Sequence, residues 1–192
     1  MIIALTGTPG SGKTTLAEAL GQKGLSIVSA QDIAARHQCI FGKDEQRNSI
    51  IIDTDCVDRI LPQYDTESKC CIIEGHITQV LTTVEYVIVL RCHPTVLSKR
   101  LQDKTWAEKK IRENIASEIL GVILTEAIEL HGIGKVIELD SSTKSIPELV
   151  EIIIGLLQSA FENIAEYQPG SVDWLPVLLE KKYSWMVNED GP

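Results

Sequence analysis

A glycine-rich motif near the amino terminus constrains this chain more than any other feature. Residues 7–15 read Gly-Thr-Pro-Gly-Ser-Gly-Lys-Thr-Thr, which fills the pattern G-x-x-x-x-G-K-[ST]. An apolar run at residues 1–5 precedes the motif and a helical pattern follows it, which is the strand–loop–helix context that a phosphate-binding loop requires. The alternative is a plain glycine-rich turn. The spacing, the Lys-Thr pair and both flanks together favour a phosphate-binding loop (P-loop).

The residue types of this motif suit the binding of a nucleoside triphosphate. Glycines allow backbone N–H groups to converge on an anion, and the helix that follows directs its positive dipole end toward the phosphates. We expect Lys13 to reach the β- and γ-phosphates and the Thr14 hydroxyl to ligate Mg²⁺. The motif therefore predicts ATP and Mg²⁺ at this end of the chain.

Composition narrows the class of protein. The 192 residues suit one domain with a substantial core, and the net charge of −9 argues against non-specific nucleic-acid binding. The first residues lack the basic region of a signal peptide, and no apolar run approaches the roughly 20 residues of a membrane span. No C-x-x-C pair occurs, so we expect buried free thiols in a reducing compartment and no zinc site. With no signal peptide or membrane span expected, we predict a cytoplasmic protein. The cysteines are residues 39, 56, 70, 71 and 92.

Short apolar runs alternate with helical patterns, which indicates βαβ units and a parallel sheet. The residues 86–90 form a near-continuous apolar run, which is typical of a central strand covered on both faces. We predict strands at about 2–6, 26–29, 70–74, 85–91 and 135–139. We predict helices at about 13–22, 30–37, 55–62, 93–103, 108–131 and 145–165.

Two segments do not fit the plain alternation, and the tail has a different character. Residues 38–52 and the charged residues 102–110 interrupt the pattern, and they suit substrate-covering insertions at the carboxyl edge of the sheet. Ordinary surface loops are the alternative. The tail from residue 165 is rich in turns and aromatics, and either packs on the domain or contacts a partner.

A carboxylate and a histidine stand at the end of a predicted strand. Glu74 ends the apolar run and is placed to hold a Mg²⁺-bound water, while His76 shares its face in an extended chain and is a candidate to orient a water or contact an acceptor phosphate. A solvated strand end is the alternative for Glu74, and one histidine is weak evidence by itself. Asp53 and Asp55 compete as carboxylates, but helix capping is the favoured interpretation for them.

Two arginines are candidates for substrate contacts. Arg100 stands just before the charged interruption, where it is placed to neutralise the transferring phosphoryl group. Arg36 ends the helix after the second strand, where a monophosphate acceptor would dock. Lys104, Lys109 and Arg112 cluster near the interruption, and a plain helix-surface charge is the alternative for each of these side chains.

At this point the chain resembles a known family, the small adenylate kinases of the isoenzyme 6 type, which also act as ribosome-assembly ATPases. The resemblance covers nearly the whole chain. It implies a three-layer P-loop NTPase fold, with a five-stranded parallel sheet in the order 2-3-1-4-5 and helices on both faces. The similar segments are residues 5–15, 73–76, 89–91, 96–101, 106–114 and 167–174.

The resemblance also implies a domain organisation. Residues 1–165 would form the kinase domain, with a monophosphate-binding region at about 28–51 and a short lid at about 103–113, and residues 166–192 would form a tail. Lys144 would lie near the adenine, and Lys104 replaces the arginine with which the family lid commonly begins. Glu74 and His76 match the acid-x-His element of the family. The implied phosphate-binding residues are Gly10, Gly12, Lys13, Thr14 and Thr15.

Three functions follow as expectations. The first is an adenylate kinase of broad monophosphate specificity that converts ATP and AMP into two ADP, with Lys13, Arg100 and His76 as its catalytic residues. The second is a nucleotide-switched ATPase that handles the ribosomal protein uS11 (S14 in eukaryotes) during small-subunit rRNA maturation. The third is another small-molecule kinase on the same fold, acting on gluconate, shikimate or a nucleoside.

Overall fold

The computed structural model describes residues 1–44, 49–64, 70–104 and 106–186. Its centre is a five-stranded parallel sheet in the order β2-β5-β1-β6-β7. Numbered within this sheet alone, the order is 2-3-1-4-5, so the predicted topology is confirmed. The strands are β1 (Ile2–Gly7), β2 (Ser26–Ser29), β5 (Cys71–Glu74), β6 (Tyr86–Arg91) and β7 (Val136–Asp140).

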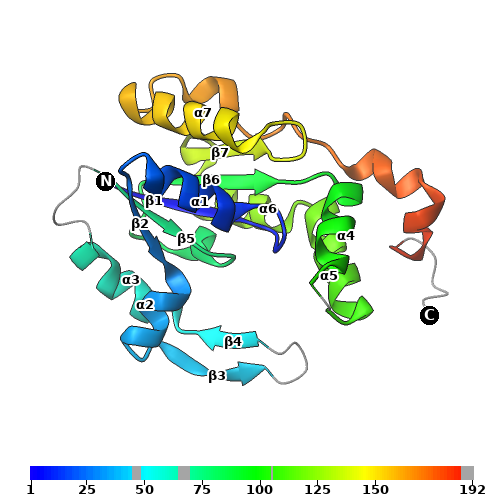
Figure 1. Ribbon diagram of the computed structural model, residues 1–192, viewed down its shortest axis with the longest axis horizontal. Coiled ribbons are helices and arrows are strands. Elements are labelled where there is room, and N and C mark those ends of the chain that lie inside the picture. Colours follow the sequence, from blue (N-terminus) through cyan, green and yellow to red (C-terminus); the bar gives the residue numbers. More distant parts are fainter. Residues whose placement is uncertain (45–48, 65–69, 105, 187–192) are drawn as a thin grey trace.

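Helices cover both faces of this sheet, because alternate residues of the buried strands point to opposite sides. The side chains of Ile3 and Leu5 pack with α1 (Lys13–Gln22) and α7 (Ile146–Gln158). Those of Ile2 and Ala4 pack with α2 (Ala30–Arg36), α3 (Thr54–Ile60) and α6 (Val122–His131). The result is the expected three-layer arrangement (Figure 1).

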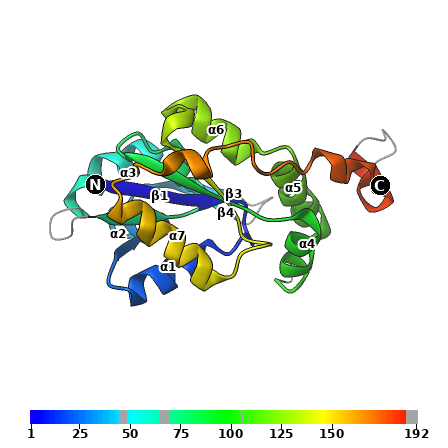
Figure 2. The ribbon, with the colours of Figure 1, turned by 90° about the horizontal axis from the view of Figure 1, so that it is seen from above.

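Two helices stand beyond the carboxyl end of β1, namely α4 (Pro94–Gln102) and α5 (Glu108–Ile119) (Figure 2). The prediction of one helix over residues 108–131 is wrong. The chain turns at Gly121, whose φ of 64° is a left-handed conformation that glycine adopts without strain, and α6 starts in a new direction. Apolar periodicity continued through this turn and therefore hid it.

The last predicted helix is shorter than expected. Helix α7 ends at Gln158, and the chain reverses at Ala160 and Phe161, both with positive φ. Phe161 is buried and stacks on Tyr86 with 3.8 Å between the ring centroids. The burial of Phe161 and its stacking on the partly buried Tyr86 offset the strain of the turn.

The insertion at residues 38–52 contains an antiparallel hairpin of β3 (Ile40–Asp44) and β4 (Ser49–Ile52), which projects away from the main sheet (Figure 1). Cys39 and Cys56 form a disulfide at its base, which corrects the expectation of five free thiols. The hairpin returns the chain so that Asp53 N–H donates to Cys39 O at 2.9 Å, and this closure brings the two cysteines together across 17 residues. The other three cysteines are buried thiols that form no disulfide.

The predicted cap is confirmed, because the Asp53 carboxylate accepts a hydrogen bond from Cys56 N–H at 3.0 Å at the start of α3. The tail packs on the domain over its described part. Val177 and Tyr183 are buried against Ile115 and Ile119 of α5. The ribbon of the tail accordingly runs beside α5 (Figure 2). Among the residues that the structure describes, no helix has the length and apolar character needed to cross a membrane.

Candidate active site

The P-loop joins the end of β1 to the start of α1. Gly7 has a φ of 139°, and a Cβ there would lie only 2.4 Å from the carbonyl oxygen of Leu90. No other residue fits that position without moving the neighbouring strand. Helix α1 starts at Lys13 directly after Gly12, so the N–H groups of its first turn have no carbonyl partner within the helix. These N–H groups are the expected hydrogen-bond donors to a bound phosphate.

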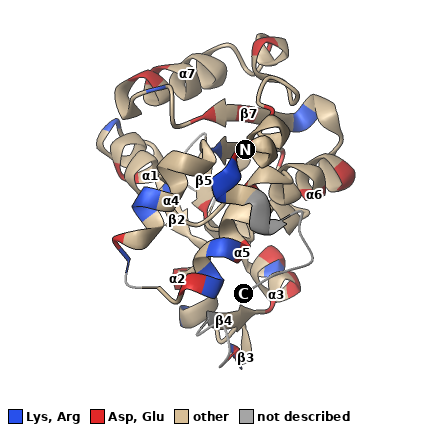
Figure 3. Cartoon of the chain, turned by 90° about the vertical axis from the view of Figure 1, so that its right-hand side faces the viewer, with Lys and Arg blue, Asp and Glu red and all other residues tan. Residues whose placement is uncertain are grey.

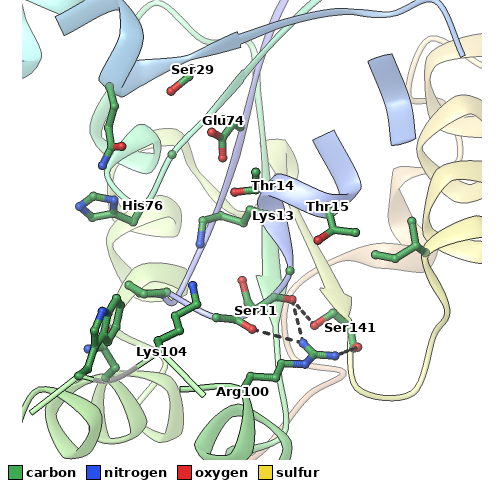
Figure 4. Close-up of a pocket in the computed structure, with 18 of the residues that line it drawn as sticks. Ser11, Lys13, Thr14, Thr15, Ser29, Glu74, His76, Arg100, Lys104 and Ser141 are labelled. Carbon is green, nitrogen blue, oxygen red and sulfur yellow. Dashed lines mark hydrogen bonds between the residues drawn. The ribbon is translucent and has the colours of Figure 1, made fainter. Parts of the chain in front are cut away.

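A cavity of about 1200 Å³ opens on this loop. The P-loop forms one wall, and the end of β5 with the start of α2 forms a second. Helix α5 and the segment before it form a third wall, and the loop after β7 forms the fourth (Figure 4). Lining residues include Gly10, Ser11, Gly12, Lys13, Thr14, Thr15, Ser29, Gln31, Ile50, Glu74, His76, Arg100, Lys104, Trp106, Lys110, Asn114, Ser141 and Lys144.

Lys13 is buried at the centre of the P-loop. Its Nζ donates to the carbonyl oxygens of Gly7 at 2.7 Å and Thr8 at 3.1 Å. Burial lowers the pKa of Lys13 to about 8, and the carboxylate of Glu74 partly opposes that shift. A phosphate at this position would stabilise the ammonium form, because it supplies the negative charge that the buried lysine lacks.

Glu74 and Thr14 lie side by side at the mouth of the loop (Figure 4). Burial raises the pKa of Glu74, while Lys13 and a hydrogen bond from the Thr14 hydroxyl oppose the shift. His76 lies beyond Glu74 on the same side of the cavity, and its pKa is lowered by burial and by the positive charges of Lys13 and Lys110. The structure therefore brings together the carboxylate, hydroxyl, ammonium and imidazole that the sequence analysis selected.

Arg100 lies on the other side of the P-loop from Lys13 (Figure 4). Its guanidinium donates to the carbonyl oxygens of Gly10 at 3.4 Å, Ser11 at 3.3 Å and Ser141 at 3.4 Å. In this arrangement Arg100 links the P-loop to the segment that follows β7, and so stabilises the conformation of the loop. Its action on the transferring phosphoryl group stays a prediction.

Two of the three predicted lysines line the cavity, Lys109 does not, and one further lysine joins them. Lys104 and Lys144 are lining residues on different walls. Lys110 also lines the cavity and lies over the Trp106 ring, 4.4 Å from its centroid. The sequence analysis named Lys109 instead, although the i, i+4, i+8 spacing of Trp106, Lys110 and Asn114 was a usable signal.

Arg36 is exposed at the end of α2, outside the set of residues that line the cavity. Ser29 and Gln31, at the start of the same helix, line it instead. A contact between Arg36 and a bound monophosphate stays a prediction that requires this part of the chain to move. Residues 45–48 of the predicted monophosphate-binding region and Thr105 of the predicted lid lie outside the described residues.

Helix α4 carries Lys99 and Arg100 and no acidic residue, and it lies at this end of the molecule, whereas α5 carries as many glutamates as Lys and Arg (Figure 3). The positive charge of α4, in an acidic chain, favours an anionic ligand.

Comparisons with known proteins agree with this geometry. A family model described as "AAA domain" matches residues 3–121. A protein of Archaeoglobus fulgidus named "Putative adenylate kinase" is 38% identical over 97% of this chain and 98% of its own length. Proteins of the same name from Methanocaldococcus jannaschii and Pyrococcus abyssi are 32% and 36% identical, over 98% and 94% of this chain and 99% and 94% of their own lengths.

Solved structures support the fold alone. TT1252 from Thermus thermophilus superimposes with a TM-score of 0.57 at 15% identity, over 82% of this chain and 97% of that one. Shikimate kinase from Bacteroides thetaiotaomicron gives 0.51 at 19% identity, over 82% and 98%. Fold, P-loop and relatives agree, and the chain therefore belongs to the AAA-domain family of P-loop kinases, in the group that holds the archaeal proteins named putative adenylate kinases.

Proposed function

We propose that this protein is a Mg²⁺-dependent nucleoside-monophosphate kinase that transfers the γ-phosphoryl group of ATP to AMP and so forms two ADP. The observation that carries the proposal is the size and lining of the cavity. Pockets for one small ligand usually measure about 300–1000 Å³. The volume of about 1200 Å³ suits two nucleotides, and the cavity extends from the P-loop to Ser29, Gln31 and Ile50.

An unpaired polar atom supports a ligand at the P-loop. Among the described residues, Ser11 Oγ is the one buried side-chain oxygen or nitrogen without a hydrogen-bond partner. Ser11 lines the cavity beside Lys13. Because an unsatisfied buried hydroxyl is costly, a phosphate oxygen or a bound water is the expected partner.

The chain fits Mg²⁺ bound together with a nucleotide. The Thr14 hydroxyl and the Glu74 carboxylate are oxygen donors, as Mg²⁺ prefers. Within the part of the chain that the structure describes, no group of three or more His, Cys, Asp or Glu is placed to hold a metal. The phosphates and water would therefore supply most of the ligands, with Thr14 bound directly and Glu74 through water. The ion would neutralise phosphate charge during transfer.

Each wall has a part in the proposed reaction. Lys13 would exchange its contacts with the Gly7 and Thr8 carbonyls for the phosphate oxygens, and the amides of the P-loop would bind the same charge. Lys104 and Lys144 would flank the ATP, while Lys110 and His76, which also line the cavity, would face the acceptor. A phosphate oxygen of AMP would attack the γ-phosphorus of ATP, and the bond between that phosphorus and the oxygen bridging to the β-phosphate would break. The acceptor is therefore AMP, and no hydroxyl of the protein needs to accept the phosphoryl group.

The decisive experiment is a coupled assay of ADP formation from Mg-ATP with a panel of nucleoside monophosphates, and with shikimate and gluconate as other acceptors. We expect ADP formation that depends on a monophosphate, with AMP among the accepted substrates. Turnover without any monophosphate dependence, or with shikimate or gluconate only, would refute the proposed reaction.

A second function is proposed from the resemblance, namely slow ATP hydrolysis coupled to binding of uS11. The exposed apolar side chains of the hairpin favour a protein partner beside the cavity. Ile40, Phe41 and Ile51 are 39%, 75% and 47% exposed, and their neighbour Ile50 lines the cavity. A pull-down of purified uS11 with and without ATP tests this function, and binding that ignores the nucleotide would argue against a switch.

A further inference from the structure

A buried charge network lies behind the P-loop, outside the cavity. Arg91 at the end of β6 is positioned between Glu118 of α5 and Glu138 of β7. Its Nε donates to Glu118 Oε1 at 2.8 Å and its Nη1 donates to Glu138 Oε1 at 2.6 Å. All three residues are at least 96% buried, since their exposed fractions are 4%, 2% and 2%. One guanidinium faces two carboxylates, so the network needs further donors.

The carboxyl-terminal tail supplies most of those donors, and the backbone N–H of Cys92 adds one more to Glu118 Oε1 at 3.0 Å. Glu138 Oε2 accepts hydrogen bonds from the backbone N–H groups of Gly170 at 2.9 Å, Ser171 at 3.1 Å and Val172 at 3.3 Å. The Trp174 indole N–H donates to Glu118 Oε1 at 3.1 Å. The tail reaches these groups by running from α7 past α5 (Figure 2). Without the tail, the buried carboxylate of Glu138 would lose most of its hydrogen-bond partners, which is costly in the protein interior.

The network also holds the P-loop. Glu118 Oε2 accepts a hydrogen bond from Thr8 Oγ1 at 2.5 Å. The carbonyl oxygen of the same Thr8 accepts a hydrogen bond from Lys13 Nζ at 3.1 Å. Thr8 therefore ties the network behind the loop to the backbone of the P-loop itself, next to the carbonyl that holds Lys13 in the absence of nucleotide.

We propose that Glu118 and Trp174 are positioning residues of the nucleotide site. The docked tail helps to order Glu118 through Trp174, beside the donors from Arg91 and Cys92. Glu118 in turn holds Thr8, and Thr8 keeps the P-loop in the conformation that binds phosphate. Nucleotide binding and tail docking then stabilise each other, because such coupling is reciprocal. The inference rests on the proposed nucleotide-binding function and adds a regulatory input to it, since a partner that captured the tail would weaken nucleotide binding.

The variant that tests the coupling is Trp174→Phe. It removes the indole N–H but keeps an aromatic ring against His93, whose ring centroid lies 4.9 Å from that of Trp174. Leu179→Ala is the matched control, because Leu179 lies in the same tail and is 91% exposed. Isothermal titration with Mg-ADP should show roughly fivefold to tenfold weaker binding for Trp174→Phe and no change for Leu179→Ala.

A double variant separates positioning from a general loss of stability. Thr8→Val removes the hydroxyl that reaches Glu118 from the other side. If both contacts act through Glu118, the effects of Thr8→Val and Trp174→Phe on the Kd for Mg-ADP are smaller together than the product of the single effects. A tail with a purely structural function would lower the unfolding temperature of Trp174→Phe and leave its Kd unchanged, and that result would overturn the proposal.

Fluorescence gives an independent readout. In the Trp106→Phe/Trp185→Phe background, Trp174 is the one tryptophan left of three. Saturation with Mg-ADP should shift its emission and reduce its quenching by acrylamide, although Trp174 is outside the set of residues lining the cavity. Binding of Mg-ADP by calorimetry without any change in this signal would overturn the coupling alone. Absence of Mg-ADP binding by the wild-type protein would instead refute the nucleotide site, and the coupling with it.

Discussion

The two sides of the cavity are built in different ways. The phosphate side comes from consecutive residues, a buried strand, a glycine loop and the first turn of α1, and Lys13 is already held there by two carbonyl oxygens. The acceptor side comes from separate segments, namely the start of α2, the β3–β4 hairpin and α5. A continuous motif gives the first side one conformation. The second side depends on how distant elements meet, which suits a region that closes over a substrate.

The largest expected effect is on the phosphate side. Lys13→Ala removes the one ammonium at the centre of the P-loop, and we expect turnover to fall by about three orders of magnitude or more, since transition-state charge loses its main stabilising group. Initial rates of ADP formation from Mg-ATP and AMP measure it. Lys23→Ala, a change in the same helix region but remote from the loop, is the control and should keep the wild-type rate. A Lys13→Ala rate near that of wild type would refute the assignment of Lys13 to phosphate binding on this side of the cavity.

The rigidity of the phosphate side is tested by Gly7→Ala. The new Cβ would lie 2.4 Å from Leu90 O at a positive φ, so we expect a loss of roughly 2–4 kcal/mol in the free energy of unfolding. Chemical denaturation measures it. Gly155→Ala in α7 is the matched control, because a Cβ there meets no atom within 4 Å and alanine favours a helix by about 1 kcal/mol. Equal free energies of unfolding for Gly7→Ala and Gly155→Ala would show that the P-loop accommodates the extra methyl group and is not rigid.

The acceptor side is tested by Lys110→Ala. Lys110 lines the cavity over Trp106, and we expect the KM for AMP to rise by about tenfold while the KM for ATP changes little, because one charge contact with the acceptor is lost. The exposed neighbour Lys109 supplies the control, and Lys109→Ala should change neither constant. A rise in the KM for ATP instead would assign Lys110 to the phosphate side.

The smallest effect concerns pH. In the protein without nucleotide, Lys13 has a pKa of about 8, and a phosphate binds the ammonium form of this side chain. Bound nucleotide raises this pKa, because its negative charge stabilises the ammonium form. The affinity for Mg-ADP is therefore highest well below pH 8, and it falls as the pH rises above 8. Between pH 8 and 9 the Kd for Mg-ADP should increase about fivefold. Titration calorimetry at both pH values measures it, and Lys13→Ala should lack this dependence. An equal slope in the variant would assign the proton to another group.

Local patterns predicted a large part of this molecule. The P-loop, the five parallel strands, the cap at Asp53 and the cavity position of Glu74 and His76 follow from motifs or from the rule that parallel strands end at one edge. The order of the strands came only from the resemblance to a known family. The wrong predictions share a cause. The turn at Gly121, the early end of α7 and the Cys39–Cys56 pair depend on contacts between segments, on which apolar periodicity and cysteine spacing carry no information.

By itself the sequence determined the phosphate half of the site, because a few consecutive residues set both the backbone path of the P-loop and the charge at its centre. Only the tertiary structure decided which lysine of α5 enters the cavity, where Arg100 is held, and that Arg91, Glu118 and Glu138 meet behind the loop. Those three residues lie 20 or more positions apart. Their contacts form because a buried charge must find partners once the sheet and helices have closed around it.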